Sequence, residues 1–282
     1  MVKNLEYKIV DGNLGAVRQL TEAGYRLQTV LELQNDRCKD GQEGLQNRLF
    51  YVADGSVFYQ DPKNGAVSWA HTDGKHNLVI QPQYLERALK DLHQTYIFQP
   101  DNVKESWNVI KSRSTKRFAL SDLRLVREDD EFSFMPIKTG RYDALSSVQQ
   151  KAASLVGFTP KNVDYLKQKG IKDTRLWLLN PEYVALVLEE ENVPFWRASW
   201  LKNFNHNSNF SANFRDINLN YCLRGVRREV IPEGDALKNK VPSAPQEVRL
   251  ATFDEVRAYS ACFVPDVVRE QFELGLRQLY KS

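Results

Sequence analysis

The order of apolar and polar residues along the chain predicts an α+β fold with an antiparallel β-sheet and flanking helices. Short apolar runs bounded by turn residues are typical of strands, and apolar residues recurring every three or four positions are typical of helices. The expected strands include Tyr7–Val10, Val67–His71, Asn77–Ile80, Arg175–Leu179 and Arg224–Val230. The expected helices include Val30–Arg37, Tyr84–His93, Ser146–Leu155, Pro160–Gln168 and Pro181–Glu191.

Side chains that can cap a helix locate the starts of the two N-terminal helices. Thr29 and Glu32 have the spacing of a capping box, in which each side chain bonds the backbone N–H of the other residue. Asp11 and Asn13 are expected to cap a helix over Leu14–Ala23. Two consecutive helices separated by a glycine are therefore predicted near the start of the chain.

Asp-Gly and Asn-Gly pairs predict tight turns, because these residues tolerate a positive φ. The segment Arg48–Asp61 has two aliphatic-aromatic runs around Asp54-Gly55, which predicts a hairpin centred on this pair. Further turns are expected at Asn64-Gly65 and Asp73-Gly74. Gly225, inside the last expected strand, indicates a close approach of another backbone.

One window departs from these patterns. From Asn203 to Asn220, seven of 18 residues are Asn, whereas the other 264 residues contain 12. Asn is unfavourable inside helices and strands, so this window is expected to form exposed loops and short edge strands. Phe204, Phe210 and Phe214 are interspersed with the Asn residues. Rigid aromatic side chains among short polar ones make a good contact surface.

Five residue types are missing from the same window. Lys, Glu, Gln, Met and Trp do not occur from Asn203 to Cys222, although they make up 60 of the other 262 residues. All five have only codons that end in a purine, and every residue present can be written with a codon that ends in a pyrimidine. Scattered substitution of adenines in an Asn-rich template would leave this composition.

The window and its flanks resemble the variable region of a target protein of a diversity-generating retroelement. In that family, adenine-specific mutagenic reverse transcription rewrites AAY codons in a short cassette. The flanks FWRASW and LRGVRRE are similar to the family's W-x-x-S-x-W and L-R-G-V/F-R ends. The segment GYRLQTVLELQ, Gly24–Gln34, is similar to the G-[YW]-R-L-P-T-x-x-E-L signature of related lectin-like domains, with Gln28 in place of Pro. About 50 residues follow the cassette, which is often near the C-terminus in this family.

This resemblance, nearest to the archaeal AvpA-like branch, implies a C-type-lectin-like fold elaborated by insertions. It implies a single domain over 1–282, with a variable cassette at about 203–222 and a C-terminal helical segment at about 247–282. Trp196 and Trp200 would anchor the cassette, and the varied side chains would point to solvent. Joint replacement of Asn205, Asn207, Phe210 and Phe214 is then expected to leave thermal stability nearly unchanged. The implied ligand-binding residues are Asn203, Phe204, Asn205, His206, Asn207, Ser208, Asn209, Phe210, Ser211, Asn213, Phe214, Asp216, Asn218, Asn220, Tyr221 and Cys222.

Three alternatives remain open at this stage. The window could be a low-complexity loop, although such linkers favour Gly and Pro, which are absent here. The chain could be a lectin-like enzyme of the formylglycine-generating type, which would need a reactive cysteine pair or a metal. It could also bind nucleic acid through the basic run Lys111–Arg117 and the segment Arg224–Arg228.

Composition narrows the choice of partner. The net charge is +3, from 39 basic and 36 acidic residues, which argues against nucleic acid as the main partner. Cys38, Cys222 and Cys262 lack CxxC spacing, and the four histidines lack metal-ligand spacing, so no cofactor or metal is expected. No signal peptide or membrane span is recognisable, so the expected location is the cytoplasm, or a cell or virion surface reached by another route. The expected function is binding of a protein or surface ligand, without catalysis.

Overall fold

The computed structural model describes residues 5–12, 14–94, 98–204, 209–212 and 222–228 of the chain. The chain divides into two compact units, Met1–Val230 and Ile231–Ser282. All described residues belong to the first unit. The helical segment expected at about 247–282 falls outside them.

Eleven strands of the described residues form one connected sheet. Its main path runs through β1 (Leu5–Asp11), β11 (Cys222–Arg228), β3 (Phe50–Gln60), β9 (Phe195–Leu201), β10 (Phe210–Ser211), β8 (Asp173–Leu179), β7 (Phe132–Lys138) and β6 (Val126–Arg127). Off this path, β2 (Arg26–Leu27) pairs with β11, and β4 (Val67–Thr72) pairs with β3 and with β5 (Lys116–Ala119). The pairs β11–β3 and β10–β8 are parallel, so the sheet is mixed, although most of its pairs are antiparallel as expected.

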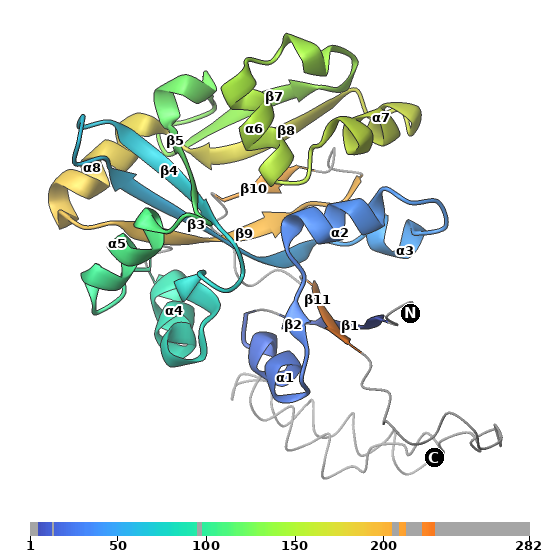
Figure 1. Ribbon diagram of the computed structural model, residues 1–282, viewed down its shortest axis with the longest axis horizontal. Helices are drawn as coiled ribbons and strands as arrows, with labels where there is room; N and C mark the ends of the chain where they lie inside the picture. Colours follow the sequence, from blue (N-terminus) through green and yellow to red (C-terminus); the bar gives the residue numbers. More distant parts are fainter. Residues whose placement is uncertain (1–4, 13, 95–97, 205–208, 213–221, 229–282) are drawn as a thin grey trace, which may run out of the picture. The chain divides into compact units, whose positions relative to one another are not determined.

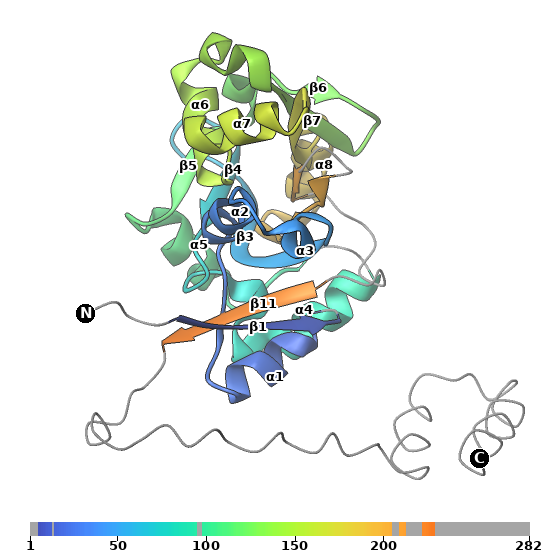
Figure 2. The same cartoon turned by 90° about the vertical axis from the view of Figure 1, so that its right-hand side faces the viewer.

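The main path has two halves, β1 to β9 and β8 to β6, with β10 between them. Helices pack beside both halves (Figure 1). The α-helices are α1 (Ala16–Glu22), α2 (Val30–Arg37), α3 (Glu43–Gln46), α4 (Pro82–Gln94), α5 (Val103–Lys111), α6 (Ser147–Leu155), α7 (Pro160–Gln168) and α8 (Pro181–Glu191). Three short 3₁₀ helices are η1 (Leu78–Ile80), η2 (Leu120–Leu123) and η3 (Thr139–Ala144). In Figure 2, β1 and β11 run side by side with α1 next to them.

The strands at the centre of the sheet are buried on both faces. Along β9, Phe195 and Leu201 belong to a core shared with α2, α6, α7 and α8. Trp196, Ala198 and Trp200 belong to a second core, shared with α1, α4 and α5. All seven residues of β9 are buried, including the polar Arg197 and Ser199, whose side chains bond Glu131 and Ser56.

Helix starts that depend on local capping lie where the sequence places them. The Thr29 hydroxyl accepts a hydrogen bond from the Glu32 backbone N–H, and the Glu32 carboxylate accepts one from the Thr29 N–H, so the capping box is complete. Helix α2 accordingly begins at Val30 and ends at Arg37. Pro181 begins α8, whose N-cap is Asn180. These side chains satisfy backbone donors that the helix itself cannot.

The expected start of α1 is wrong. The helix begins at Ala16, with Gly15 at its N-cap and no side-chain cap. Asp11 belongs to β1 and lies opposite Cys222 in the ladder with β11. Its carboxylate accepts hydrogen bonds from Arg48 and from the Cys222 thiol, so it is not available to cap a helix. Asn13 lies outside the described residues.

The hairpin expected at Asp54-Gly55 is also wrong. Strand β3 runs through this pair, and the chain reverses instead after Asp61, where Asn64-Gly65 forms the expected turn. The Asp54 carboxylate accepts hydrogen bonds from the Val30 N–H at the start of α2 and from His71 Nε2. A Cβ at Gly55 would lie 2.6 Å from Asn77 Oδ1. Tertiary packing therefore requires this Asp and this Gly inside a strand, where they imitate a turn signal.

The strand expected over Asn77–Ile80 is the 3₁₀ helix η1. The Asn77 side chain accepts a hydrogen bond from the Val79 N–H at 3.1 Å and donates one to the Ala53 carbonyl at 2.9 Å. This local bond to the backbone caps a helical turn, which competes with an extended conformation. Leu78 and Val79 are buried in this 3₁₀ helix, which accounts for their apolar side chains.

Candidate functional site

The candidate site is the cassette, defined here as residues 203–222, together with the residues that hold it. Asn203, Phe204, Asn209–Ala212 and Cys222 are described; Asn205–Ser208 and Asn213–Tyr221 lie outside the described residues. The cassette begins after β9, contributes β10, and ends where β11 begins. The described residues therefore show its two ends and its middle.

The strand before the cassette is anchored by its two tryptophans. Trp196 is fully buried and Trp200 is 2% exposed. The Trp196 indole N–H donates a hydrogen bond to Ser106 Oγ at 2.9 Å, so its one polar atom has a partner. Both tryptophans lie in the core shared with α1, α4 and α5. Their expected role as anchors is confirmed.

An arginine of α2 holds the first residues after β9. The guanidinium of Arg37 is fully buried and donates hydrogen bonds to the Lys202 carbonyl at 2.8 Å and to the Gln46 carbonyl at 3.3 Å. Its carbon Cζ lies 4.8 Å from the centre of the Phe204 ring. Burial lowers the pKa of Arg37 to about 9, which still leaves it charged at neutral pH. We call Arg37, Lys202 and Phe204 the upstream clasp.

The same helix holds the strand after the cassette. Arg224 Nη1 donates hydrogen bonds to Asp36 Oδ2 at 2.6 Å and to Gln28 Oε1 at 2.9 Å. Gln28 Nε2 in turn donates to Asp36 Oδ2 at 3.0 Å, so the three side chains form a closed network. The Gln28 backbone N–H also bonds the Arg224 carbonyl. We call Gln28, Asp36 and Arg224 the downstream clasp.

The downstream clasp gives a physical reason for Gln28, the residue that departs from the lectin-like signature. Its amide can donate to Asp36 and accept from Arg224 at once, whereas a proline there could do neither and would lack a backbone N–H. Strand β2 pairs with β11 directly beside it, with Leu27 opposite Gly225. The two sequence segments that resemble known signatures thus meet in space.

The close approach expected at Gly225 exists, but the neighbour is a side chain rather than a backbone. A Cβ at Gly225 would lie 2.8 Å from Tyr25 Cβ and 3.0 Å from Leu20 Cδ2.

Gly225→Ala is therefore expected to lower the free energy of unfolding by about 1–3 kcal/mol, the usual cost of overpacking. Urea denaturation of the variant and the wild type measures this difference in the free energy of unfolding. Gly140→Ala is the control, because nothing lies within 4 Å of its added Cβ. Equal losses in both variants would contradict this packing.

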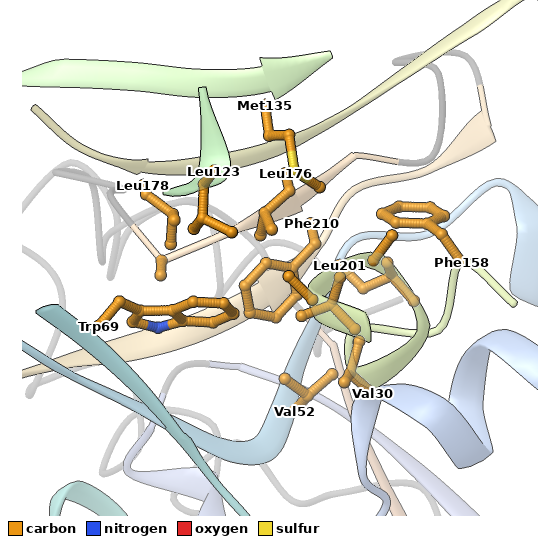
Figure 3. Close-up of a cluster of buried hydrophobic side chains, with 14 of the residues drawn as sticks. Val30, Val52, Trp69, Leu123, Met135, Phe158, Leu176, Leu178, Leu201 and Phe210 are labelled. Carbon is orange, nitrogen blue, oxygen red and sulfur yellow. The ribbon is translucent and has the colours of Figure 1, made fainter. Parts of the chain in front are cut away.

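The middle of the cassette is part of the core. Strand β10 pairs antiparallel with β9 and parallel with β8, so Phe210 and Ser211 join the two halves of the sheet. Phe210, Ser211 and Ala212 are fully buried, and Asn209 is 9% exposed. Figure 3 shows the Phe210 ring between Trp69, Leu176 and Leu201. The expectation that cassette side chains point to solvent is wrong for these residues.

The side chain of Asn209 takes the place of a backbone hydrogen-bond acceptor beside β10. Its side-chain oxygen accepts a hydrogen bond from the Arg175 N–H at 2.9 Å, and its carbonyl accepts one from the Lys202 N–H at 2.8 Å. A side chain turned to solvent would lose the bond to Arg175. The sequence signal for β10 is weak, because two residues give no period and the neighbouring Asn residues indicate a loop.

Cys222, the last residue of the cassette, is also buried. Its thiol donates a hydrogen bond to Asp11 Oδ1 at 3.0 Å. Burial and this bond raise the pKa of Cys222 to about 11, and burial raises that of Cys38 to about 12. Both are free thiols and stay protonated at neutral pH, which disfavours nucleophilic chemistry. Cys262 lies outside the described residues.

Sequence reasoning did not single out Asp36 or Arg37, the clasp residues of α2. A signal for Arg37 exists in the helical spacing: Val30, Leu33, Gln34 and Arg37 recur at the spacing of one helix face, and all four are buried. A cation in phase with an apolar stripe indicates a buried role. Its acceptors are carbonyl groups distant in sequence, which the sequence pattern does not reveal.

The downstream clasp gives stability a dependence on pH. Burial works against ionisation of Asp36, but hydrogen bonds from Lys39, Gln28 and Arg224 outweigh it and hold the pKa of Asp36 below its usual range. A carboxyl with a lowered pKa in the folded state stabilises the protein above its unfolded-state pKa of about 3.9, and this contribution disappears as the pH falls through the folded-state value.

We therefore expect the free energy of unfolding to fall below about pH 4, and less steeply in Asp36→Asn. Chemical denaturation at a series of pH values measures this slope. The matched control is Asp164→Asn, at an exposed position on α7, which should keep the wild-type slope. Identical slopes for Asp36→Asn and the wild type would contradict the assignment.

Within the described part of the chain, no group of three or more His, Cys, Asp or Glu side chains could hold a metal ion. A search of the same residues finds no helix with the length and apolarity needed to cross a membrane. No family model and no curated protein matches the chain.

A solved structure described as "Accommodation of massive sequence variation in Nanoarchaeota by the C-type lectin fold" is similar to this chain. The match covers 80% of this chain and 99% of that one, with a TM-score of 0.52 and 11% sequence identity. At this identity the likeness shows the fold and no more. The chain has a C-type-lectin-like fold, in which a mixed sheet and its flanking helices hold both ends of the Asn-rich cassette.

Proposed function

We propose that this protein binds ligands through a diversified surface made by the cassette, and that a retroelement diversifies that surface. It would then be a target protein of a diversity-generating retroelement, of the archaeal AvpA-like branch. The observation that carries the proposal is the pair of clasps. Residues outside or at the very edge of the cassette fix the position of both ends, through Arg37 upstream and through Asp36 and Arg224 downstream.

A surface that varies needs a framework whose stability does not depend on the varied side chains. Trp196, Trp200 and Leu223 are buried beside the cassette and belong to its constant flanks. Among the described cassette positions, Asn209–Ala212 and Cys222 supply structure rather than a contact surface. We therefore assign the ligand contacts to Asn203, Asn205–Ser208 and Asn213–Tyr221, and leave Phe204 to the upstream clasp. The structurally similar protein is described as accommodating massive sequence variation, which is consistent with this division.

We also propose that the protein acts by binding alone, without catalysis. The raised pKa values of Cys38 and Cys222 oppose thiolate formation at neutral pH. The residues proposed to contact the ligand are mostly Asn, Ser and aromatic residues, which supply hydrogen bonds and contact area.

Two experiments test the two parts of this proposal. For diversification, the surrounding DNA should hold a near-copy of codons 195–228 that differs only at adenines and adjoins a reverse transcriptase gene. A near-copy with differences at all four bases, or the absence of any copy, would contradict it.

For binding, a displayed library can be randomised at the adenines of the codons for Asn205, Asn207, Asn218 and Asn220. Selection on an immobilised protein panel should enrich different cassettes for different targets. A library randomised at matched Asn positions outside the cassette, such as Asn47, Asn64 and Asn108, is the control. Equal enrichment from both libraries would contradict a role for the cassette.

A further inference from the structure

A groove of about 880 Å³ lies between β5 and the helices α6 and α7, and none of the described cassette residues lines it. Its lining residues come from five elements or their edges, and Figure 2 shows β5 below α6. Its lining residues are Leu31, Lys116, Arg117, Phe118, Tyr142, Ser147, Gln150, Lys151, Ser154, Leu155, Thr159 and Pro160.

The groove has an apolar floor. Leu31, on the outer face of α2, is 38% exposed, although it lies next to the core residue Val30. Leu155 is half-buried, while Phe118 and Tyr142 are buried, with 8% and 7% of their surface exposed. An apolar side chain placed here would remove hydrocarbon surface from water on both partners.

The rim of the groove carries positive charge. Lys116, Arg117 and Lys151 are exposed, and no Asp or Glu is among the described residues that line the groove. None of these three cations forms an ion pair in the part of the chain that the structure describes. Exposed arginines elsewhere, such as Arg18 and Arg26, do pair with carboxylates. The groove therefore complements a partner that brings its own negative charge.

Strand β5 adds a possible backbone contact. It pairs with β4 along one edge, and among the described strands no other pairs with it. An unpaired strand edge presents N–H and C=O groups that an extended peptide can bond. The basic run Lys111–Arg117 ends inside this strand, which places two of its cations at the rim.

We infer that this groove binds an extended acidic peptide segment of a partner protein. An apolar side chain of the peptide occupies the floor, and flanking carboxylates face Lys116, Arg117 and Lys151. The floor favours a peptide over nucleic acid, because its aromatic rings are buried and offer no exposed face for base stacking. The lining includes none of the described cassette residues, and the inference does not depend on the function proposed for the cassette.

Fluorescence anisotropy with the full-length protein tests the inference. The probe is a short labelled peptide that alternates Glu with Leu. Two comparison peptides carry Lys in place of Glu or Ser in place of Leu, and a labelled single-stranded DNA of similar length tests the other class of ligand. We expect saturable, salt-sensitive binding of the Glu-Leu peptide and at least about tenfold weaker binding of the others.

Two variants locate the site. Lys116→Glu combined with Arg117→Glu is expected to weaken peptide binding at least about tenfold. Lys63→Glu combined with Lys172→Glu has the same change in net charge at exposed positions outside the groove, and should bind like the wild type. Leu31→Ala should also weaken binding, whereas Leu186→Ala, at another exposed leucine, should not.

Three results would overturn the inference. One is the absence of saturable peptide binding up to about 1 mM, the weak limit of specific association. Another is equal loss in the groove variant and its charge-matched control, which would show a nonspecific charge effect. The third is tighter binding of the DNA than of the peptide, which would identify the rim as a nucleic-acid surface. Circular dichroism of each variant confirms that it is folded.

Discussion

Phe210→Ala is expected to lower the free energy of unfolding by about 3–5 kcal/mol, the usual cost of removing a buried phenylalanine. The ring is fully buried between residues of β4, β8 and β9, and it packs edge-on against His71 at 6.1 Å between ring centres. Its strand also joins β9 to β8. The cavity would therefore open where the two halves of the sheet meet.

Urea denaturation of the variant measures this loss. Phe204→Ala is the matched control, since Phe204 is another cassette phenylalanine but is half-buried against Arg37. A clearly smaller loss is expected for it. If Phe210→Ala costs less than Phe204→Ala, the place of β10 in the core is wrong. The sequence-based expectation that replacing Asn205, Asn207, Phe210 and Phe214 together leaves thermal stability nearly unchanged therefore needs correction at Phe210.

Arg224→Met is expected to lower the free energy of unfolding by about 2–3 kcal/mol, the range for losing hydrogen bonds to charged groups that are largely buried. The side chains of Arg224 and Asp36 are 10% and 14% exposed. Among the described residues, the substitution leaves Asp36 with Gln28 and Lys39 as donors. Part of the loss should reflect the carboxylate that keeps its burial but loses a partner.

A double-mutant cycle separates this interaction from other effects. Because Asp36→Asn and Arg224→Met remove the same contact, the double variant should lose less stability than the two single variants together. The comparison pair is Arg18–Glu86, which has a similar separation of 2.7 Å but is well exposed. Glu86→Ala should change stability much less, since water screens that pair. Full additivity at Asp36 and Arg224 would contradict the downstream clasp.

Local chemistry explains which elements the sequence predicts well. Helix α2 has the predicted bounds because a capping box is complete within four residues. The same holds for α7, which begins at Pro160 after Thr159, and α8, which begins at Pro181 after Asn180. In each case, the residues that set the boundary are neighbours in sequence.

The misplaced elements depend on contacts that are distant in sequence. Asp54 bonds Val30 and His71, and Gly55 makes room for Asn77, so a pair that normally forms a turn is held inside β3. Asp11 likewise bonds Cys222 instead of capping α1. A polar side chain satisfied by a distant partner looks the same in sequence as one satisfied locally.

The packed ends of the cassette were predictable from the sequence, whereas the strand in its middle was not. The two tryptophans and the glycine of the flanks indicated packed ends, and both ends are packed. The composition of the cassette gave no sign that Phe210 belongs to the sheet or that Asn209 bonds it, because the Asn-rich sequence around them has neither a helical nor a strand period. The segment proposed to vary therefore contains a strand that belongs to the core.

The central claim is that a constant framework holds a replaceable segment, with β10 belonging to the framework. Deep mutational scanning of residues 195–228, scored by protease resistance, tests it most directly. The expected result is tolerance of most substitutions at Asn205, Asn207, Asn218 and Asn220. Loss of folded protein is expected for most substitutions at Phe210, Trp196, Trp200 and Arg224. Equal sensitivity of the Asn positions and Phe210, or tolerance at Phe210, would contradict the claim.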